Sequence, residues 1–245
     1  MGHLRNVLCA SVLVLLVGAG CGPVVYTATD IATRFLSVPA TVAPPDTLRN
    51  VHLHERDDGR LAFQSDQSFG ELRMHWSSGY RADRGVDILE AGNFSTFATL
   101  WSRELRLASM NSRTSIGAYE PGEAKEAIAR EVDAPHNETV QIDVHVYIDR
   151  GVRSSYGATN LRSARWEIFL LTSDGTRHPP ENVEAGIARR LSWSDDTRAH
   201  YRPNILTFER RPDDETDLLA EPDSLELHIR DSVQSLDVMF GWRFE

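Results

Sequence analysis

Residues 139–149 read Thr-Val-Gln-Ile-Asp-Val-His-Val-Tyr-Ile-Asp, and this alternation of apolar and polar side chains indicates a β-strand. Successive side chains of a strand point to opposite faces, so every second residue lies on the same face. One face is therefore wholly apolar, and it holds Val140, Ile142, Val144, Val146 and Ile148. An antiparallel sheet with one face on a core and the other in water is built from such strands. We therefore expect Gln141, Asp143 and His145 to face solvent.

The same two-residue period recurs along the chain on both sides of this segment. Towards the C-terminus it predicts strands at Arg165–Thr172, Ile205–Arg210, Leu225–Arg230 and Leu236–Phe244. Towards the N-terminus, two alternating runs flank Asp57-Asp58-Gly59, which predicts a hairpin over residues 51–63. A further strand is expected at Glu71–Ser77, with Leu72, Met74 and Trp76 on one face.

Between these strands the apolar period changes to that of a helix. Apolar residues recur at helical spacing from Phe94 to Ala108, with Asn93 at the expected N-cap. A second, weaker helix is expected at Pro121–Val132, with Pro121 in its first turn. The sequence thus predicts a helical insertion at about residues 85–135.

Eight predicted strands and one helical insertion indicate a mainly β protein. We expect a two-sheet antiparallel β-sandwich of immunoglobulin-like architecture, formed by residues 51–245, and a β-barrel is the alternative. About 225 residues follow the N-terminal apolar segment, which suffices for one large domain with a substantial core.

The N-terminal segment has the features of an export signal. Arg5 supplies a positive charge, and residues 7–17 are nearly all apolar but too few to span a bilayer. The small residues at 18–20 then precede Cys21 directly. The only other cysteine is Cys9, so cleavage before Cys21 leaves a chain with one cysteine and no internal disulfide.

Gly18-Ala19-Gly20-Cys21 resembles the lipobox of bacterial lipoproteins, in which small residues precede a lipidated cysteine. Gly18 departs from that pattern, because Leu is usual there. The resemblance implies a signal peptide at residues 1–20, a fatty acid such as palmitate on Cys21, and a lipidated tether at residues 21–50. It also implies attachment to the bacterial cell envelope, and Gly22, in place of Asp, favours the outer membrane. An ordinary signal peptide or an uncleaved anchor remains the alternative.

Residues Trp166 to Val183 carry a second resemblance, which extends over about the last two-thirds of the chain. The pattern Trp166-x-Ile168-x-Leu170, followed by Asp174-Gly175, is similar to exported bacterial lipoproteins of unknown function. These residues are structural in type. The resemblance therefore supports a β fold and implies no activity.

The charge of the chain limits its partners. The sequence holds 26 basic and 36 acidic residues, a formal net charge of −10. Such a surface repels nucleic acid and anionic lipid headgroups, so we expect neither as a partner. Lys125 is the only lysine. This bias fits either a GC-rich genome or adaptation to high salt.

Candidate chemistry is sparse. His52 and His54 lie two apart on a predicted strand, so both imidazoles could face one metal ion. No third or fourth ligand can be assigned to them, and we expect a solvent-facing strand surface and no metal. Nucleophile-elbow, metalloprotease and phosphate-loop motifs do not occur in the sequence, and we expect no cofactor.

These observations favour a non-enzymatic, membrane-anchored lipoprotein that binds an envelope protein or serves envelope assembly. The expected partner contacts lie in the helical insertion, where Met110, Ile116 and Tyr119 stand among small polar residues. A β-sandwich that binds a carbohydrate or another small ligand is the alternative. A hydrolase without a recognisable motif is a third hypothesis.

Overall fold

A computed structural model describes residues 36–84, 94–113, 119–120, 122–149, 160–192, 198–213, 216–220, 223–231 and 236–245. The predicted signal peptide, Cys21 and Ile116 lie outside these residues. Within them, the strands form two six-stranded sheets and one two-stranded sheet. The chain is therefore mainly β, with several antiparallel sheets.

The first large sheet, here called the outer sheet, has the strand order β1-β14-β13-β8-β9. Its strands are β1 (Ala40–Val42), β14 (Leu236–Phe244), β13 (Ser224–Asp231), β8 (Trp166–Leu171) and β9 (Arg177–His178). Strand β5 (Arg81–Arg84) pairs with β14 as well. All these pairs are antiparallel except that of β1 with β14, which is parallel.

The second large sheet, here called the central sheet, has the order β10-β12-β7-β6-β4. Its strands are β10 (Asn182–Ala185), β12 (Arg198–Glu209), β7 (Thr139–Asp149), β6 (Phe94–Leu100) and β4 (Ser77–Ser78). Strand β11 (Arg189–Ser192) also pairs with β12. The central sheet is antiparallel throughout its described pairs.

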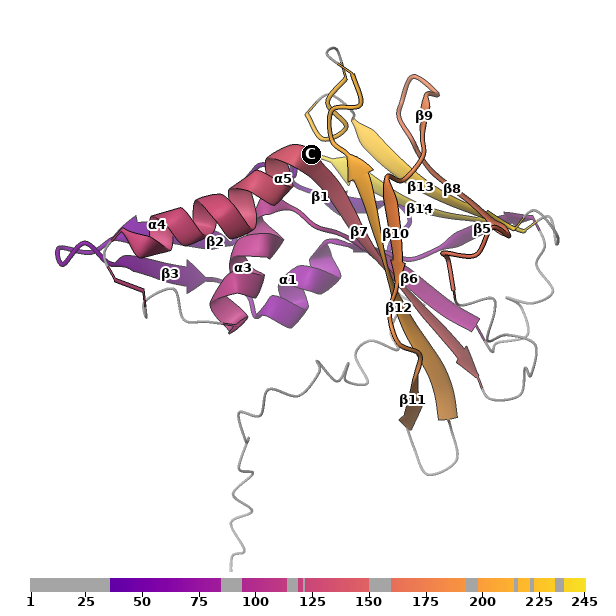
Figure 1. Cartoon of the computed structure of the whole chain (residues 1–245), viewed down its shortest axis with the longest axis horizontal. Helices are drawn as coiled ribbons and strands as arrows, with labels where there is room; N and C mark the ends of the chain where they lie inside the picture. Colours follow the sequence, from indigo (N-terminus) through magenta and orange to yellow (C-terminus); the bar gives the residue numbers. More distant parts are fainter. Residues whose placement is uncertain are drawn as a thin grey trace, which may run out of the picture.

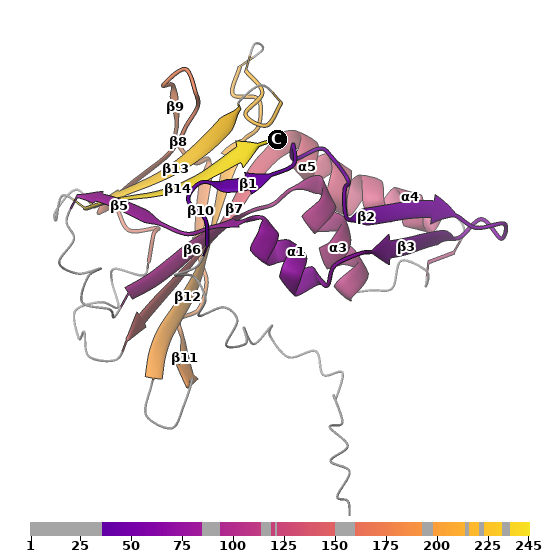
Figure 2. The same cartoon turned by 180° about the vertical axis from the view of Figure 1, so that it is seen from behind.

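A third layer of helices and one hairpin covers the central sheet (Figures 1 and 2). The hairpin joins β2 (Val51–Glu55) and β3 (Leu61–Ser65) around Gly59, whose φ of 78° suits a residue without a Cβ. The helices are α1 (Phe69–His75), α3 (Arg103–Arg113), α4 (Glu123–Ile128), the π-helix η3 (Ala129–Asp133) and α5 (Ala134–Glu138). The central sheet is thus the middle of three layers.

Strand β7 lies at the centre of the fold and confirms the prediction for residues 139–149. Ile142, Val144 and Val146 are buried, as their alternation requires. The opposite face, however, does not lie in water, so that part of the prediction is wrong. His145 is 1% exposed and Asp143 is half-buried, because α1 and α3 cover this face of the sheet.

The prediction of a strand at Glu71–Ser77 is also wrong, because residues 69–75 form α1. The Ser68 hydroxyl accepts a hydrogen bond from the Glu71 N–H (3.2 Å), and the Glu71 carboxylate accepts one from the Ser68 N–H (2.8 Å). This capping box starts a helix at Phe69. Leu72 and Trp76, which are four residues apart, are both buried on one side of it.

The helix predicted at Phe94–Ala108 is partly right. Residues 94–100 form β6, and α3 begins only at Arg103, while the expected N-cap Asn93 lies outside the described residues. Ser102 caps α3, because its Oγ accepts a hydrogen bond from the Leu105 N–H (3.1 Å). The second predicted helix is confirmed, and it continues through η3 and α5 to Glu138.

Part of the predicted tether belongs to the folded domain. Strand β1 pairs with the last strand of the chain, in the register Ala40↔Trp242. The buried Glu104 carboxylate of α3 accepts hydrogen bonds from the backbone N–H groups of Arg49 (2.7 Å) and Asn50. The domain therefore begins before residue 51.

Candidate functional site

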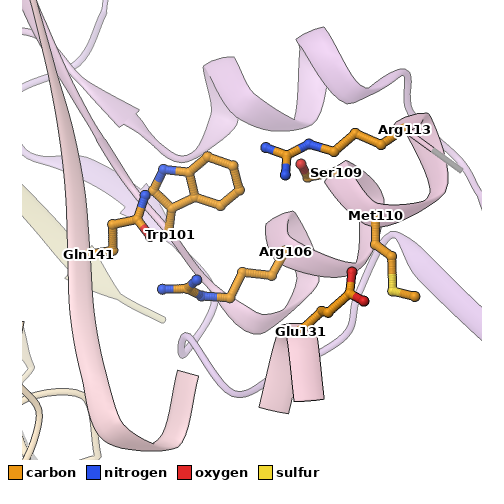
Figure 3. A pocket seen from close by; sticks show the side chains of 7 residues that line it. All are labelled: Trp101, Arg106, Ser109, Met110, Arg113, Glu131 and Gln141. Carbon is orange, nitrogen blue, oxygen red and sulfur yellow. The ribbon is translucent and has the colours of Figure 1, made fainter. Parts of the chain in front are cut away.

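A pocket of about 410 Å³ lies between the helical layer and the central sheet (Figure 3). It is bounded by α3, by η3 and by the β7 strand, and Trp101 lies at the junction of β6 and α3. The lining side chains are Trp101, Arg106, Ser109, Met110, Arg113, Glu131 and Gln141. Its volume falls within the range of about 300–1,000 Å³ that is typical of small-molecule sites.

Helix α3 supplies most of the lining residues. Residues 106, 109 or 110, and 113 are three or four apart, so a helix places them along one side. The cap at Ser102 sets where this helix begins, and so which of its residues face the pocket. In Figure 3 the guanidinium group of Arg113 extends over the pocket, and that of Arg106 extends towards Gln141.

Arg106 is the least compensated charge of this site. Its Nε and Nη2 atoms are shielded from solvent and have no hydrogen-bond partner among the described residues. Its Cζ lies 5.9 Å from the centre of the Trp101 ring, within reach of a cation–π interaction. Burial lowers the pKa of Arg106 to about 10, and the Asp143 carboxylate opposes this decrease. Arg106 therefore remains charged at neutral pH.

Asp143 lies beneath the pocket. The Gln141 Nε2 donates a hydrogen bond to its Oδ1 (3.0 Å). Burial raises the pKa of this carboxyl, while the Gln141 and Trp101 side chains and the charges of Arg73 and Arg106 act to lower it. The positive charges of two arginines, Arg73 and Arg106, thus act on the one carboxylate of Asp143.

Arg73 and His145 form the deepest polar pair in this region, and both are buried. A guanidinium can only donate, so the Nε2 of His145 must accept the hydrogen bond from Arg73 Nη2, and the imidazole is neutral. Burial, followed by the charge of Arg73, lowers the pKa of His145 well below its ordinary value. Its ring also stacks on Phe97, with 4.6 Å between ring centres. The pair holds α1 on the central sheet.

The rim of the pocket carries one further cation and one anion. Arg113 is exposed and has no ion-pair partner among the described residues. The Glu131 carboxylate already accepts a hydrogen bond from the Nη2 of its neighbour Arg130 (2.8 Å). The lining residues therefore present an excess of positive charge in a protein whose net charge is −10.

The lining residues suit binding better than catalysis. Among them the only nucleophile type is Ser109, and neither a histidine nor a cysteine accompanies it. A serine acts as a nucleophile when a neighbouring base activates it. The charged groups that line the pocket are two guanidinium groups and one carboxylate, that of Glu131, so cationic donors outnumber anionic acceptors.

Of the described residues that were predicted as functional, only Met110 lines this pocket. His52 and His54 are exposed on β2, and His52 Nε2 lies 3.3 Å from Asp66 Oδ2. Within the described ranges, no group of three or more His, Cys, Asp or Glu residues could hold a metal ion. Met110 is buried and lines the pocket, whereas Tyr119 packs half-buried against the core.

Sequence reasoning did not find Arg106, Trp101 or Gln141. It expected one helix from Phe94 to Ala108, whereas α3 begins only at Arg103. The relevant signal is the spacing of Arg106, Met110 and Arg113, which brings two guanidinium groups and one apolar side chain to the same side of α3.

A second arginine cluster joins β12 to the N-terminal part of the domain. Arg210 donates through Nε to Asp217 Oδ1 (2.8 Å), through Nη2 to Asp46 Oδ2 (3.0 Å) and through Nη1 to the His136 carbonyl (3.2 Å). Asp46 Oδ1 also lies 2.6 Å from His136 Nε2. All three nitrogens of the Arg210 guanidinium thus donate hydrogen bonds to protein groups.

A third cluster lies on the outer sheet. Phe169 and His228 stack with 5.0 Å between ring centres, and Arg177 and Arg230 lie over the Phe169 ring. Both arginines are paired with carboxylates: Arg177 with Glu167 (3.7 Å) and Arg230 with Asp237 (2.8 Å). These contacts explain the burial of the two rings without a ligand.

In the part of the chain that the structure describes, no helix is both long enough and apolar enough to cross a membrane. Comparisons of the chain with protein-family models, with curated proteins and with solved structures found no match. The pocket between α3 and β7 is therefore interpreted from its own geometry.

Proposed function

We propose that this protein is a non-enzymatic binding protein of the bacterial cell envelope, anchored by lipid on Cys21, and that it binds a small ligand in the pocket between α3, η3 and β7. The observation that carries the binding role is the Arg106 guanidinium, whose Nε and Nη2 atoms are shielded from solvent and lack hydrogen-bond partners among the described residues. The lipid anchor is supported by the N-terminal sequence alone.

A buried donor without a partner costs about 1–3 kcal/mol, and more when it is charged. Folded proteins therefore pair nearly all such groups with protein, water or ligand. Two unpaired N–H groups of one guanidinium beside a pocket are explained if a bound molecule supplies the acceptors.

The layered fold supports this role. We propose that the outer and central sheets act together as a distorted β-sandwich, a rigid base on which the helical layer forms one wall of the site. Strand β7 contributes Gln141 to the pocket and Ile142 to the core, so the same strand connects the site to the rigid part of the domain.

The binding role is tested by filling the pocket. Ser109→Phe places a ring in the pocket, whereas Ser112→Phe places the same ring on an exposed position of the same helix. We expect a library of neutral, cationic and anionic fragments, screened by ligand-observed NMR on the full-length protein, to give binders of the wild type and of Ser112→Phe. The same fragments should not bind Ser109→Phe.

Melting temperatures show whether the two variants fold, and Ser109→Leu replaces Ser109→Phe if the latter does not. Fragments that bind all variants equally would show that the pocket is not the binding site.

The anchor is tested separately by membrane fractionation. We expect Cys21→Ser to move the protein from the membrane pellet to the soluble fraction, because the lipid supplies the hydrophobic attachment. Cys9→Ser is the matched control, since Cys9 lies in the segment that cleavage would remove, and it should remain in the pellet. Recovery of Cys21→Ser in the pellet would contradict the lipid anchor.

A further inference from the structure

We infer that the ligand of this pocket is a small organic monoanion with a carboxylate on an apolar body. This inference rests on the proposed binding function and adds the chemical class of the ligand. Three features of the site carry it: the free edge of Arg106, the charge balance of the pocket, and the apolar part of its wall.

The first feature is which donors of Arg106 are unpaired. Nε and Nη2 lie on the same edge of a guanidinium group, and their two parallel N–H bonds match the two oxygens of a carboxylate. Both atoms lack a hydrogen-bond partner among the described residues. The unpaired donors are thus a complete carboxylate-binding edge of the guanidinium.

The same chain uses this edge for a carboxylate elsewhere. Arg165 donates from Nε to Asp231 Oδ2 (2.7 Å) and from Nη2 to the same oxygen. The Asp231 side chain is buried in that pair. Arg106 offers the same pair of donors without an acceptor, so a ligand carboxylate could bind the guanidinium edge that Asp231 occupies on Arg165.

The second feature is the amount of charge. Two arginines and one glutamate line the pocket, which leaves one excess positive charge. Beneath it, the Asp143 carboxylate lies near a second guanidinium, that of Arg73. A monoanion neutralises the excess charge. A phosphate dianion would add a negative charge beside Asp143 and Glu131, in a protein whose net charge is already −10.

The third feature is the body of the ligand. Trp101 and Met110 supply apolar surface beside the charged groups, and Ser109 is small enough to leave room. An aromatic ring and a thioether are adaptable contacts for a flat or branched apolar group. The Nε and Nη2 atoms are shielded from water, so a small movement of Arg106 is needed for its ion pair with the ligand to form.

Calorimetry on the full-length protein tests the ligand class with four probes: phenylacetate, its neutral analogue phenylacetamide, phenyl phosphate and inorganic phosphate. We expect phenylacetate to bind at least tenfold more tightly than phenylacetamide. Inorganic phosphate and phenyl phosphate should bind more weakly than phenylacetate at pH 7.5.

Variants assign this preference to Arg106. Arg106→Gln should weaken phenylacetate binding at least tenfold and leave phenylacetamide unchanged, whereas Arg113→Gln, at the exposed rim, should weaken it about threefold. Arg162→Gln removes an exposed arginine outside the lining set and should have no effect.

The outcomes separate this inference from the proposed function. Equal affinities of phenylacetate and phenylacetamide, both lost in Ser109→Phe, would overturn the anion class and leave the pocket as the binding site. If phenyl phosphate or inorganic phosphate binds most tightly and Arg106→Gln abolishes that binding, the ligand carries a phosphate and not a carboxylate. Binding that Ser109→Phe leaves unchanged, or no binding of any probe, would overturn both proposals.

Discussion

Arg210 and Arg106 are both held away from water in this domain, but their surroundings differ. Arg210 is 3% exposed, and its guanidinium donates to two carboxylates and a backbone carbonyl. Arg106 has an aromatic ring beside it and one carboxylate in its vicinity, but its Nε and Nη2 have no hydrogen-bond partner among the described residues. The first arginine is a component of the fold. The second is a charge whose partner, we propose, is a ligand.

The comparison shows how a structural ion cluster can be distinguished from a binding site. Removing two charges from water is expensive, and the cost is recovered only when hydrogen bonds satisfy both groups. The Arg210 cluster meets this condition, since Asp46 and Asp217 accept from three of its N–H donors at 2.8–3.1 Å. Arg106 does not meet it, so a role in stability alone does not explain why this charge is placed there.

The largest expected effect on stability comes from removing Arg210 from its cluster. Arg210→Met should lower the free energy of unfolding by about 3–5 kcal/mol, because Asp46, Asp217 and the His136 carbonyl lose their hydrogen bonds to a buried guanidinium. Urea unfolding followed by circular dichroism measures this change. Arg211→Met is the matched control, because Arg211 is an exposed neighbour that pairs with the same Asp217 (3.1 Å). It should cost less than about 1 kcal/mol. Equal losses in both variants would contradict the structural role assigned to Arg210.

A smaller effect on stability is expected when Arg106 is removed. Arg106→Met removes unpaired buried donors, which should stabilise the fold, but it also removes a positive charge that attracts Asp143. Because these two contributions oppose each other, the free energy of unfolding should change by less than about 2 kcal/mol in either direction. The same urea titration gives the value. A loss as large as that of Arg210→Met would mean that Arg106 supports the fold, and the contrast between the two arginines would disappear.

The smallest effect is a pH dependence centred on Asp143. Burial raises the pKa of this carboxyl, so the folded state holds its proton more tightly than the unfolded chain does. This contribution to stability is complete below the ordinary aspartate pKa and is lost as pH rises through the raised pKa. The wild type should therefore lose stability relative to Asp143→Asn as pH rises from 4 to 7.

The melting-temperature difference between these two proteins at each pH isolates this effect. Asp46 and Asp217 act in the opposite direction, because hydrogen bonds and charges from Arg210 and its neighbours outweigh their desolvation and lower their pKa values. They are present in both proteins and cancel in the difference. A difference that does not vary with pH would show that the carboxyl of Asp143 has its ordinary pKa.

The strand at residues 139–149 could be predicted because its alternation is unbroken, but what covers its polar face could not. Alternation separates the two faces of a strand and says nothing of the element that packs on each. Here the covering side chains come from two helices that are distant in sequence from the strand. Arg73 of α1 donates a hydrogen bond to His145, and Arg106 of α3 supplies positive charge near Asp143. Polar residues therefore stand on a buried face, and the pattern resembles that of a solvated sheet.

Two other errors have local causes. Leu72, Met74 and Trp76 alternate as in a strand, yet Leu72 and Trp76 also have helical spacing, and the capping box of Ser68 and Glu71 favours the helix. At residues 94–100, apolar spacing suggested a helix, whereas Thr96 and Thr99 are β-branched and favour an extended chain. The candidate site depends on where α3 begins, so this second error also concealed the pocket.

The parallel pairing of β1 with β14 has a consequence for how the domain is made. Ala40 cannot find its partner Trp242 until β14 has been synthesised, and closing so long a loop is entropically costly. Until then the buried side chains of the first strand, Ala40 and Val42, have nowhere to pack. A chain truncated before residue 236 would carry an unpaired first strand, an exposed edge prone to aggregation. Strand β14 thus makes closure of this domain depend on residues that are synthesised about 200 positions after β1.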